Sequence, residues 1–324
     1  MAKSDLILSL VRAGTSGDQN LFRKTVEALI ADERAQQHNV LADNLARSLA
    51  ANGNGPYRVG TTISSDSLQT LFYDINPRRK LSELVLSRLV QRACEEIIEE
   101  QNRADLLRSH NLEPRNRILL IGPSGNGKTS LAEAVAEALM VPLIRVRYEG
   151  VIGSFLGETA GRLRRLFEYV STRHCVLFFD EFDTLGKERG DPHDTGEIKR
   201  VVSSLLLQID DLPSHVVVVT ATNHPELLDR AVWRRFQIRL NLPRPTRTQV
   251  RLWFERFRET TDFPLSTTPK TLAQQLNVVS FSELEEFCSD ILRRWLLSLG
   301  NGDHKEILRE RLLQWNARAS AQRR

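Results

Sequence analysis

A glycine-rich octapeptide, GPSGNGKT at residues 122–129, carries residue types that could hold the phosphates of a nucleotide. Its glycines allow backbone N–H groups to turn inward around phosphate oxygens without a clash from Cβ. Lys128 could reach the outer phosphates, and the Thr129 hydroxyl could ligate Mg²⁺. The pattern G-x-x-x-x-G-K-[ST] is complete. The predicted nucleotide contacts are Gly122, Pro123, Ser124, Gly125, Asn126, Gly127, Lys128, Thr129 and Ser130.

An acidic pair, Asp180 and Glu181, follows the apolar run VLFF. Ligands of open α/β sheets bind at the carboxyl ends of the strands. We therefore predict that Asp180 holds Mg²⁺ (through water) together with Thr129, and that Glu181 polarises the attacking water. An acidic pair after a strand is common by chance, so both roles depend on the phosphate loop being real.

Asn223 lies just beyond another apolar run, in VVVVTATN. At a strand end of the same sheet, its amide could contact the γ-phosphate or orient the attacking water. The alternative is that Asn223 only makes the turn at NHP, because Asn is common in turns. The position next to the predicted site favours the first interpretation.

Three arginines, Arg230, Arg234 and Arg235, lie close together in LLDRAVWRRFQ. An arginine supplied by a neighbouring subunit can stabilise the charge on a transferring phosphoryl group. The alternative is a basic helix end that interacts favourably with its own helix dipole. The pattern alone does not decide between the two.

These motifs need a scaffold of strands and helices to bring them together. Continuous apolar strands separated by amphipathic helices, here 128–140 and 196–209, indicate a parallel sheet covered on both faces. We predict an α/β fold with a five-stranded parallel sheet. The predicted strands are residues 117–122, 142–147, 174–179, 215–221 and 236–241.

The segments on either side of the sheet read as helical. Before it, apolar residues at helical spacing predict helices within 1–52, and the polar, turn-rich residues 53–66 predict a linker. After it, helices are expected over 249–259, 282–299 and 304–319, with a capping-box pattern at Ser282 and Glu285. The predicted organisation is an N-terminal helical unit, 1–52; a linker, 53–66; an α/β subdomain, 67–242; and a helical lid, 243–324.

The four motifs, in this order and followed by helices, resemble those of an AAA ATPase of the AAA+ superfamily. The resemblance covers roughly residues 67–300. It implies a five-stranded parallel sheet with a helical lid, ATP and Mg²⁺ as cofactors, and a ring, usually a hexamer, with nucleotide at each subunit junction. By resemblance, Lys128 and Thr129 belong to Walker A, and Asp180 and Glu181 to Walker B.

The resemblance also assigns the later motifs. Asn223 falls at the sensor 1 position, and Arg234 and Arg235 fall at the arginine-finger positions. The usual Pro-Gly between the two finger arginines is absent, so either arginine could reach the neighbouring site. The middle lid helix opens with FSELEEF, so no sensor 2 arginine is assigned. Asp183 resembles a second acidic position after Walker B, and a structural cap explains it equally well.

A glycine-punctuated loop carries the triplet Phe155-Leu156-Gly157. In AAA ATPases the equivalent loop faces the central pore, where an aromatic residue grips an extended polypeptide. The alternative is that Phe155 packs beneath the loop as part of the core; the surface location of most loops favours the pore. The charged segment 187–197 is a second candidate pore loop.

Composition narrows the class of protein. The chain has 324 residues, 41% hydrophobic and 27% charged, with a net charge of +4, which is too mild to indicate nucleic-acid binding by itself. The three cysteines lack metal-ligand spacing, and Cys175 reads as a small buried hydrophobe. Neither a signal-peptide pattern nor an apolar run of membrane-spanning length is present. We expect a soluble, cytoplasmic protein without membrane contact.

These observations predict an oligomeric, ATP-driven protein remodeller whose N-terminal unit is an adaptor. The sequence contains neither H-E-x-x-H nor G-x-S-x-G. Resemblance to small bacterial AAA proteins suggests a separate subtilisin-like protease as partner. One alternative is a nucleic-acid-dependent AAA+ regulator of transposition or replication, which the aromatic Phe155 disfavours. The other is a nucleotide-gated scaffold, which Glu181 disfavours.

Overall fold

The computed structural model describes residues 24–31, 70–151, 156–183, 195–261, 263–276, 280–298 and 303–321. The chain divides into two units, residues 1–62 and 63–324. In the first unit, residues 24–31 form a helix in which Val26 and Ile30 are buried. The rest of the predicted helical unit and the linker at 53–66 lie outside the described residues.

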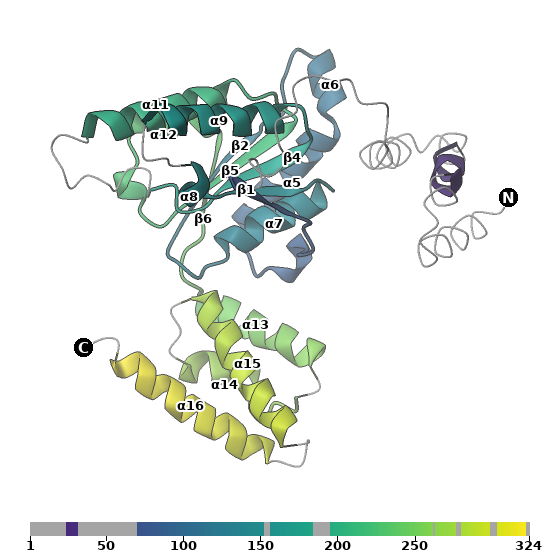
Figure 1. The fold of residues 1–324 in the computed structure, drawn as a ribbon. Coiled ribbons are helices and arrows are strands. Elements are labelled where there is room, and N and C mark those ends of the chain that lie inside the picture. Colours follow the sequence, from purple (N-terminus) through teal and green to yellow (C-terminus); the bar gives the residue numbers. More distant parts are fainter. Residues whose placement is uncertain are drawn as a thin grey trace. The chain divides into compact units, whose positions relative to one another are not determined.

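The second unit contains a six-stranded sheet in the order β1-β3-β4-β5-β2-β6 (Figure 1). The five predicted strands are present and mutually parallel. Their bounds are β2 Arg117–Ile121, β3 Leu143–Val146, β4 Cys175–Phe179, β5 Val216–Thr222 and β6 Ile238–Asn241. All residues of β4 and β5 are buried, which explains why their sequences are continuous apolar runs.

The predicted count of five strands is wrong, because β1, Phe72–Ile75, adds a sixth. It pairs antiparallel with β3 at the edge of the sheet, so the sheet is mixed. Only Phe72 of its four residues is buried, and Tyr73 is 51% exposed. A short edge strand with one covered side chain has no continuous apolar run, which is the signal that identified the others.

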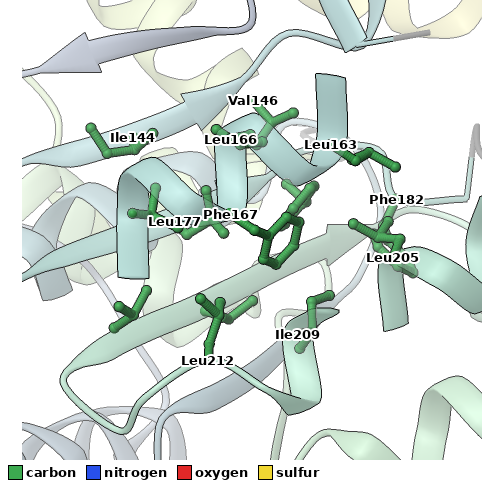
Figure 2. Close-up of a cluster of buried hydrophobic side chains, with 14 of the residues drawn as sticks. Ile144, Val146, Leu163, Leu166, Phe167, Leu177, Phe182, Leu205, Ile209 and Leu212 are labelled. Atoms are coloured by element: carbon green, nitrogen blue, oxygen red, sulfur yellow. The ribbon is translucent and has the colours of Figure 1, made fainter. Parts of the chain in front are cut away.

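Helices cover both faces of the sheet (Figure 1). On one face, side chains of α9, Leu156–Ser171, and α11, Thr195–Asp210, pack onto the strands, and Figure 2 shows them converging in a single apolar layer. On the other face, α5, Arg88–Asn102, and α7, Lys128–Ala138, pack onto the strands. The shorter helices are α6 Ala104–Ser109, α8 Tyr148–Val151, α12 Arg230–Arg235, η1 Leu81–Glu83 and η2 Pro225–Leu227.

After β6 the described residues are helical and form their own apolar core, which includes Phe254, Phe287 and Trp315. The helices are α13 Arg247–Thr260, α14 Pro269–Gln275, α15 Phe281–Leu297 and α16 His304–Ala321. The sequence analysis did not predict α14, although Thr268 caps it and Pro269 occupies its first turn. Within the described ranges, no helix combines the length and the apolar character needed to cross a membrane.

The start of α15 differs from the predicted capping box. Ser280, rather than Ser282, caps the helix, and its hydroxyl accepts a hydrogen bond from the Glu283 N–H. Ser282 lies inside the first turn, where its backbone N–H donates to the Gly125 carbonyl at 3.0 Å. The helix therefore begins in direct contact with the phosphate loop, a contact between distant segments that local patterns do not show.

Candidate nucleotide-binding site

The loop between β2 and α7 has the backbone that a phosphate-binding loop requires. Gly122, Gly125 and Gly127 all have positive φ, at 152°, 75° and 82°. A Cβ on Gly122 would lie 2.1 Å from the carbonyl oxygen of Leu242, and one on Gly125 would lie 2.3 Å from the Ser282 hydroxyl. The loop therefore needs glycine at these two positions for space as well as for conformation.

Lys128, at the start of α7, is only 7% exposed. Its ammonium donates hydrogen bonds to the carbonyls of Gly122 and Pro123, at 2.7 and 3.0 Å, and to Asn223 Oδ1 at 2.6 Å. Burial lowers the pKa of Lys128, and the nearby acidic side chains oppose this shift. The ammonium is thus buried among neutral oxygens, so a phosphate here would gain a strong charge-assisted contact.

The structure also brings the predicted metal ligands together. Asp180 Oδ2 accepts hydrogen bonds from the Thr129 hydroxyl at 3.0 Å and from Arg145 Nη2 at 3.2 Å. A hydroxyl and a carboxylate oxygen are ligands that suit Mg²⁺, so the residues present fit the ion. Mg²⁺ bound there would neutralise negative charge on the phosphates.

Sequence reasoning missed Arg145, which lies in β3. The alternating run LIRVR reads as a half-buried strand with solvent-facing arginines. The contact between Arg145 and Asp180 depends on the register of the sheet. Arg145 stands opposite Phe178, and Phe178 lies two residues before Asp180. The register of two strands cannot be read from the sequence of either one.

Glu181 has an unusual backbone. Its φ is 49°, in the left-handed region, and its N–H donates to Asp180 Oδ1 at 3.1 Å. The next residue, Phe182, is buried, and its N–H donates to the carbonyl of Ala221 in β5. Non-glycine residues in this region are strained, and such strain is concentrated at functional sites. The turn that follows β4 thus leaves Glu181 exposed beside Asp180.

Asp183 has a structural role in this geometry. It is 2% exposed and accepts a hydrogen bond from the Thr222 hydroxyl at 2.9 Å. The same hydroxyl accepts from the His224 N–H at 3.0 Å. Asp183 therefore fixes the turn that carries Asn223, which supports the structural interpretation of this residue.

The two predicted finger arginines have different surroundings on α12. Arg235 Nε donates to Asp210 Oδ2 at 2.6 Å, and Arg117 pairs with the other oxygen of Asp210. Arg234 is exposed and makes no hydrogen bond or ion pair with any residue that the structure describes. Of the two, only Arg234 has a guanidinium that is not already engaged within this part of the chain.

The predicted pore loop falls largely outside the described residues. Phe155 belongs to the undescribed segment 152–155. Leu156 and Gly157 form the first turn of α9, Leu156–Ser171, and their side chains are not described. Most of the second candidate loop, residues 187–194, is likewise outside the described ranges.

A cavity of about 280 Å³ extends from the phosphate loop. Beyond the predicted residues, it is bordered by an apolar group that sequence reasoning missed: Leu84, Val85, Leu86, Val90, Trp253 and Phe281. Apolar and aromatic surfaces are suited to the flat base of a nucleotide. These residues come from the η1–α5 connection and from α5, α13 and α15, and no local motif marks them.

Comparison with known proteins identifies the family. The family described as "ATPase family associated with various cellular activities (AAA)" matches residues 118–244. The AAA family ATPase y4kL of Sinorhizobium fredii is 33% identical over 92% of this chain and 90% of its own length.

Two further relatives match about half of this chain. A putative 26S proteasome regulatory subunit homolog of Methanothermobacter thermautotrophicus is 36% identical over 48% of this chain and 44% of its own length. The ATP-dependent zinc metalloprotease FtsH 1 of Salinibacter ruber is 34% identical over 53% of this chain and 26% of its own length. The chain thus spans less than half the length of these two relatives.

The family match and the similarity to y4kL over nearly the whole chain agree with the assembled site. The protein is an ATPase that uses ATP and Mg²⁺. The chain belongs to the AAA family of ATPases.

Proposed function

We propose that this ATPase assembles into a ring, a hexamer, that uses ATP hydrolysis to remodel or thread a protein substrate. The observation that carries the proposal is similarity over about half of the chain to a putative proteasome regulatory subunit homolog and to an ATP-dependent zinc metalloprotease. Both names connect an ATPase of this family with protein degradation. The nucleic-acid-dependent regulator is the second outcome that the experiment below would detect.

Within this proposal, the nucleotide site works as follows. Lys128 and the loop N–H groups bind the phosphates, Thr129 and Asp180 hold Mg²⁺, and Glu181 accepts a proton from the attacking water. Asn223 orients that water or the γ-phosphate. The hydrogen bond between Asn223 and Lys128 supports this role, because it places the amide beside the phosphate-binding ammonium.

Arg234 is the arginine that reaches the neighbouring subunit. Its exposed side chain, with no partner among the described residues, supports this choice. Arg235 is engaged with Asp210 inside its own subunit, so reaching across would cost that ion pair. An arginine acting between subunits would make hydrolysis depend on assembly.

Phe155, Leu156 and Gly157 form the loop that grips the substrate. An apolar side chain can grip any polypeptide regardless of its sequence, and the neighbouring glycines allow the loop to move with the nucleotide state. Leu156 and Gly157 belong to the first turn of α9, whose buried residues Leu163 and Leu166 attach it to the core of the ATPase unit. A movement of the sheet would therefore also move the loop.

The remaining parts of the chain have supporting roles in this proposal. Residues 1–52 recruit the substrate or a partner, 53–66 link this unit to the ATPase subdomain at 67–242, and 243–324 act as the lid. The protein works in the cytoplasm, and a separate subtilisin-like protease degrades the threaded substrate. The last assignment rests on resemblance to small bacterial AAA proteins alone.

The test is steady-state ATP hydrolysis at a protein concentration that supports assembly, with either an unfolded polypeptide or DNA added. We expect stimulation by the polypeptide, loss of that stimulation in Phe155→Ala, and its retention in the conservative variant Phe155→Tyr. Stimulation by DNA alone would overturn the proposal in favour of the nucleic-acid regulator. Basal hydrolysis should be equal in both Phe155 variants, because Phe155 is not among the residues that this proposal assigns to the nucleotide.

A further inference from the structure

Tyr148, the first residue of α8, has a buried phenol oxygen without a hydrogen-bond partner in the part of the chain that the structure describes. Burial of an unpaired hydroxyl costs free energy, because the hydroxyl gives up its bonds to water. Unpaired buried polar groups are uncommon, and each one calls for an explanation. For Tyr148, the explanation lies in what surrounds it.

Tyr148 lies in the same part of the molecule as the acidic turn of the site. Tyr148, Arg145, Asp180 and Glu181 line one cavity. Asp180 and Glu181 also line the nucleotide cavity, so the two cavities meet at this acidic pair.

The phenol at this position is a hydrogen-bond donor. Burial, reinforced by the carboxylates of Asp180, Asp183 and Glu181, raises the pKa of Tyr148 well above its ordinary value. The hydroxyl therefore keeps its proton at neutral pH and can donate it to a carboxylate.

Of the three carboxylates, Glu181 is the one to which the proposed function gives the proton-accepting role, and it lines the cavity together with Tyr148. Asp180 lines the same cavity, and its two oxygens accept hydrogen bonds from the Glu181 N–H on one side and from Thr129 and Arg145 on the other. The Glu181 side chain is exposed, so it can adopt more than one rotamer.

We propose that Tyr148 is a positioning residue: when ATP is bound, its hydroxyl donates a hydrogen bond to the Glu181 carboxylate and holds it toward the attacking water. The proposal rests on the role given to Glu181 above and adds a residue that no motif of the family assigns. A carboxylate on an exposed turn has several rotamers, and a fixed donor behind it selects one. Partners that orient a reacting group in this way commonly change the rate by about 10- to 100-fold.

The test compares Tyr148→Phe with the parent protein. The variant keeps the ring and removes only the hydroxyl. We expect unchanged affinity for a fluorescent ADP analogue, a Tm that is equal or higher, and a kcat lowered about tenfold or more at unchanged KM. Tyr73→Phe is the matched control, since Tyr73 lines the same cavity with an exposed side chain, and it should retain the parent kcat.

A hydroxyl without a role in positioning Glu181 predicts the same Tm change but no change in kcat. An unchanged kcat in Tyr148→Phe would overturn the proposal, as would a loss of ADP affinity in place of kcat. Glu181→Gln, measured in parallel, distinguishes a failure of the role of Tyr148 from a failure of the role of Glu181. If Glu181→Gln is inactive while Tyr148→Phe is normal, only the role of Tyr148 fails; if Glu181→Gln retains the parent rate, the role of Glu181 fails first. The double variant should be no slower than Glu181→Gln alone, because the two residues act as one unit.

Discussion

At the scale of single residues, the site consists of contacts between motifs that are far apart in the sequence. The Lys128 ammonium is hydrogen-bonded to Asn223, and the Thr129 hydroxyl to Asp180. Each contact joins the phosphate loop to the end of another strand. A substitution at any of these positions therefore affects two motifs, whereas Glu181 can be changed with less effect on its neighbours because its side chain is exposed.

The first prediction concerns Glu181. Glu181→Gln keeps the size of the side chain and its exposed position but removes the carboxylate that accepts a proton from water. We expect nucleotide affinity close to that of the parent and a kcat lower by roughly 10²- to 10⁴-fold, the usual contribution of a positioned general base. Steady-state hydrolysis and a nucleotide titration measure the two quantities. Glu149→Gln is the control, since Glu149 is an exposed carboxylate in the neighbouring cavity. A parent-like rate in Glu181→Gln would mean that another group accepts the proton.

The proximity of the contiguous motifs could be predicted from the sequence. Lys128 contacts Asn223 and Thr129 contacts Asp180, as expected because strand ends in a parallel sheet meet at one edge. Sequence reasoning missed Arg145, because its contact with Asp180 depends on the register of two strands. The apolar side of the cavity was also missed, since Trp253 and Phe281 reach it from helices beyond the sheet.

At the scale of elements, an ionic cluster joins one strand and two helices. Asp210, the last residue of α11, pairs with Arg117 of β2 and with Arg235 of α12. Arg235 also donates to the carbonyl of Ala231 in its own helix. The short helix α12 is therefore attached to the sheet unit through Arg235, and the neighbouring Arg234 is presented outward from a fixed helix.

The second prediction separates these two arginines. Arg235→Ala breaks the ion pair with Asp210 and should lower the free energy of unfolding by about 1 kcal/mol. The loss is modest because the side chains of Arg235 and Asp210 are 26% and 32% exposed. Arg234→Ala should leave the unfolding free energy within about 0.5 kcal/mol of the parent value and remove most of the ATPase activity. Thermal or urea unfolding, together with hydrolysis assays on both variants, gives the comparison. The opposite pattern, with Arg234→Ala destabilised and Arg235→Ala stable but inactive, would exchange the two assignments.

The sequence predicted the elements whose apolar residues form a clear pattern, either a continuous run or a helical period. β4 and β5 are buried at every position and read as continuous apolar runs. β1 lies at the edge of the sheet with only Phe72 buried, so it has no continuous apolar run, and α14 has seven residues, too few for a helical period to emerge. The start of α15 was placed at Ser282 instead of Phe281, because its contact with Gly125 is tertiary and has no local signature.

At the scale of the whole molecule, the phosphate loop is in direct contact with the helices after β6. The Ser282 N–H donates to the Gly125 carbonyl, and a side chain on Gly125 would collide with the Ser282 hydroxyl. Helix α15 therefore follows the phosphate loop closely, and its position depends on the conformation of that loop. In the proposed ring, this contact would allow the nucleotide state to change the position of α15 and with it the packing between neighbouring subunits.

The last prediction tests the ring itself by mixing two inactive variants. If Glu181 acts on the nucleotide of its own subunit and Arg234 on that of its neighbour, each active site needs one residue from each of two chains. Random 1:1 mixing of Glu181→Gln with Arg234→Ala then gives about a quarter of the junctions an intact pair, because a ring interface is head-to-tail. Hydrolysis should reappear on mixing, although each variant alone is nearly inactive. Mixing Glu181→Gln with the parent protein measures any inhibition by inactive subunits. If the Glu181→Gln and Arg234→Ala mixture stays inactive while the parent mixture loses activity only in proportion to dilution, Arg234 acts within its own subunit or not at all.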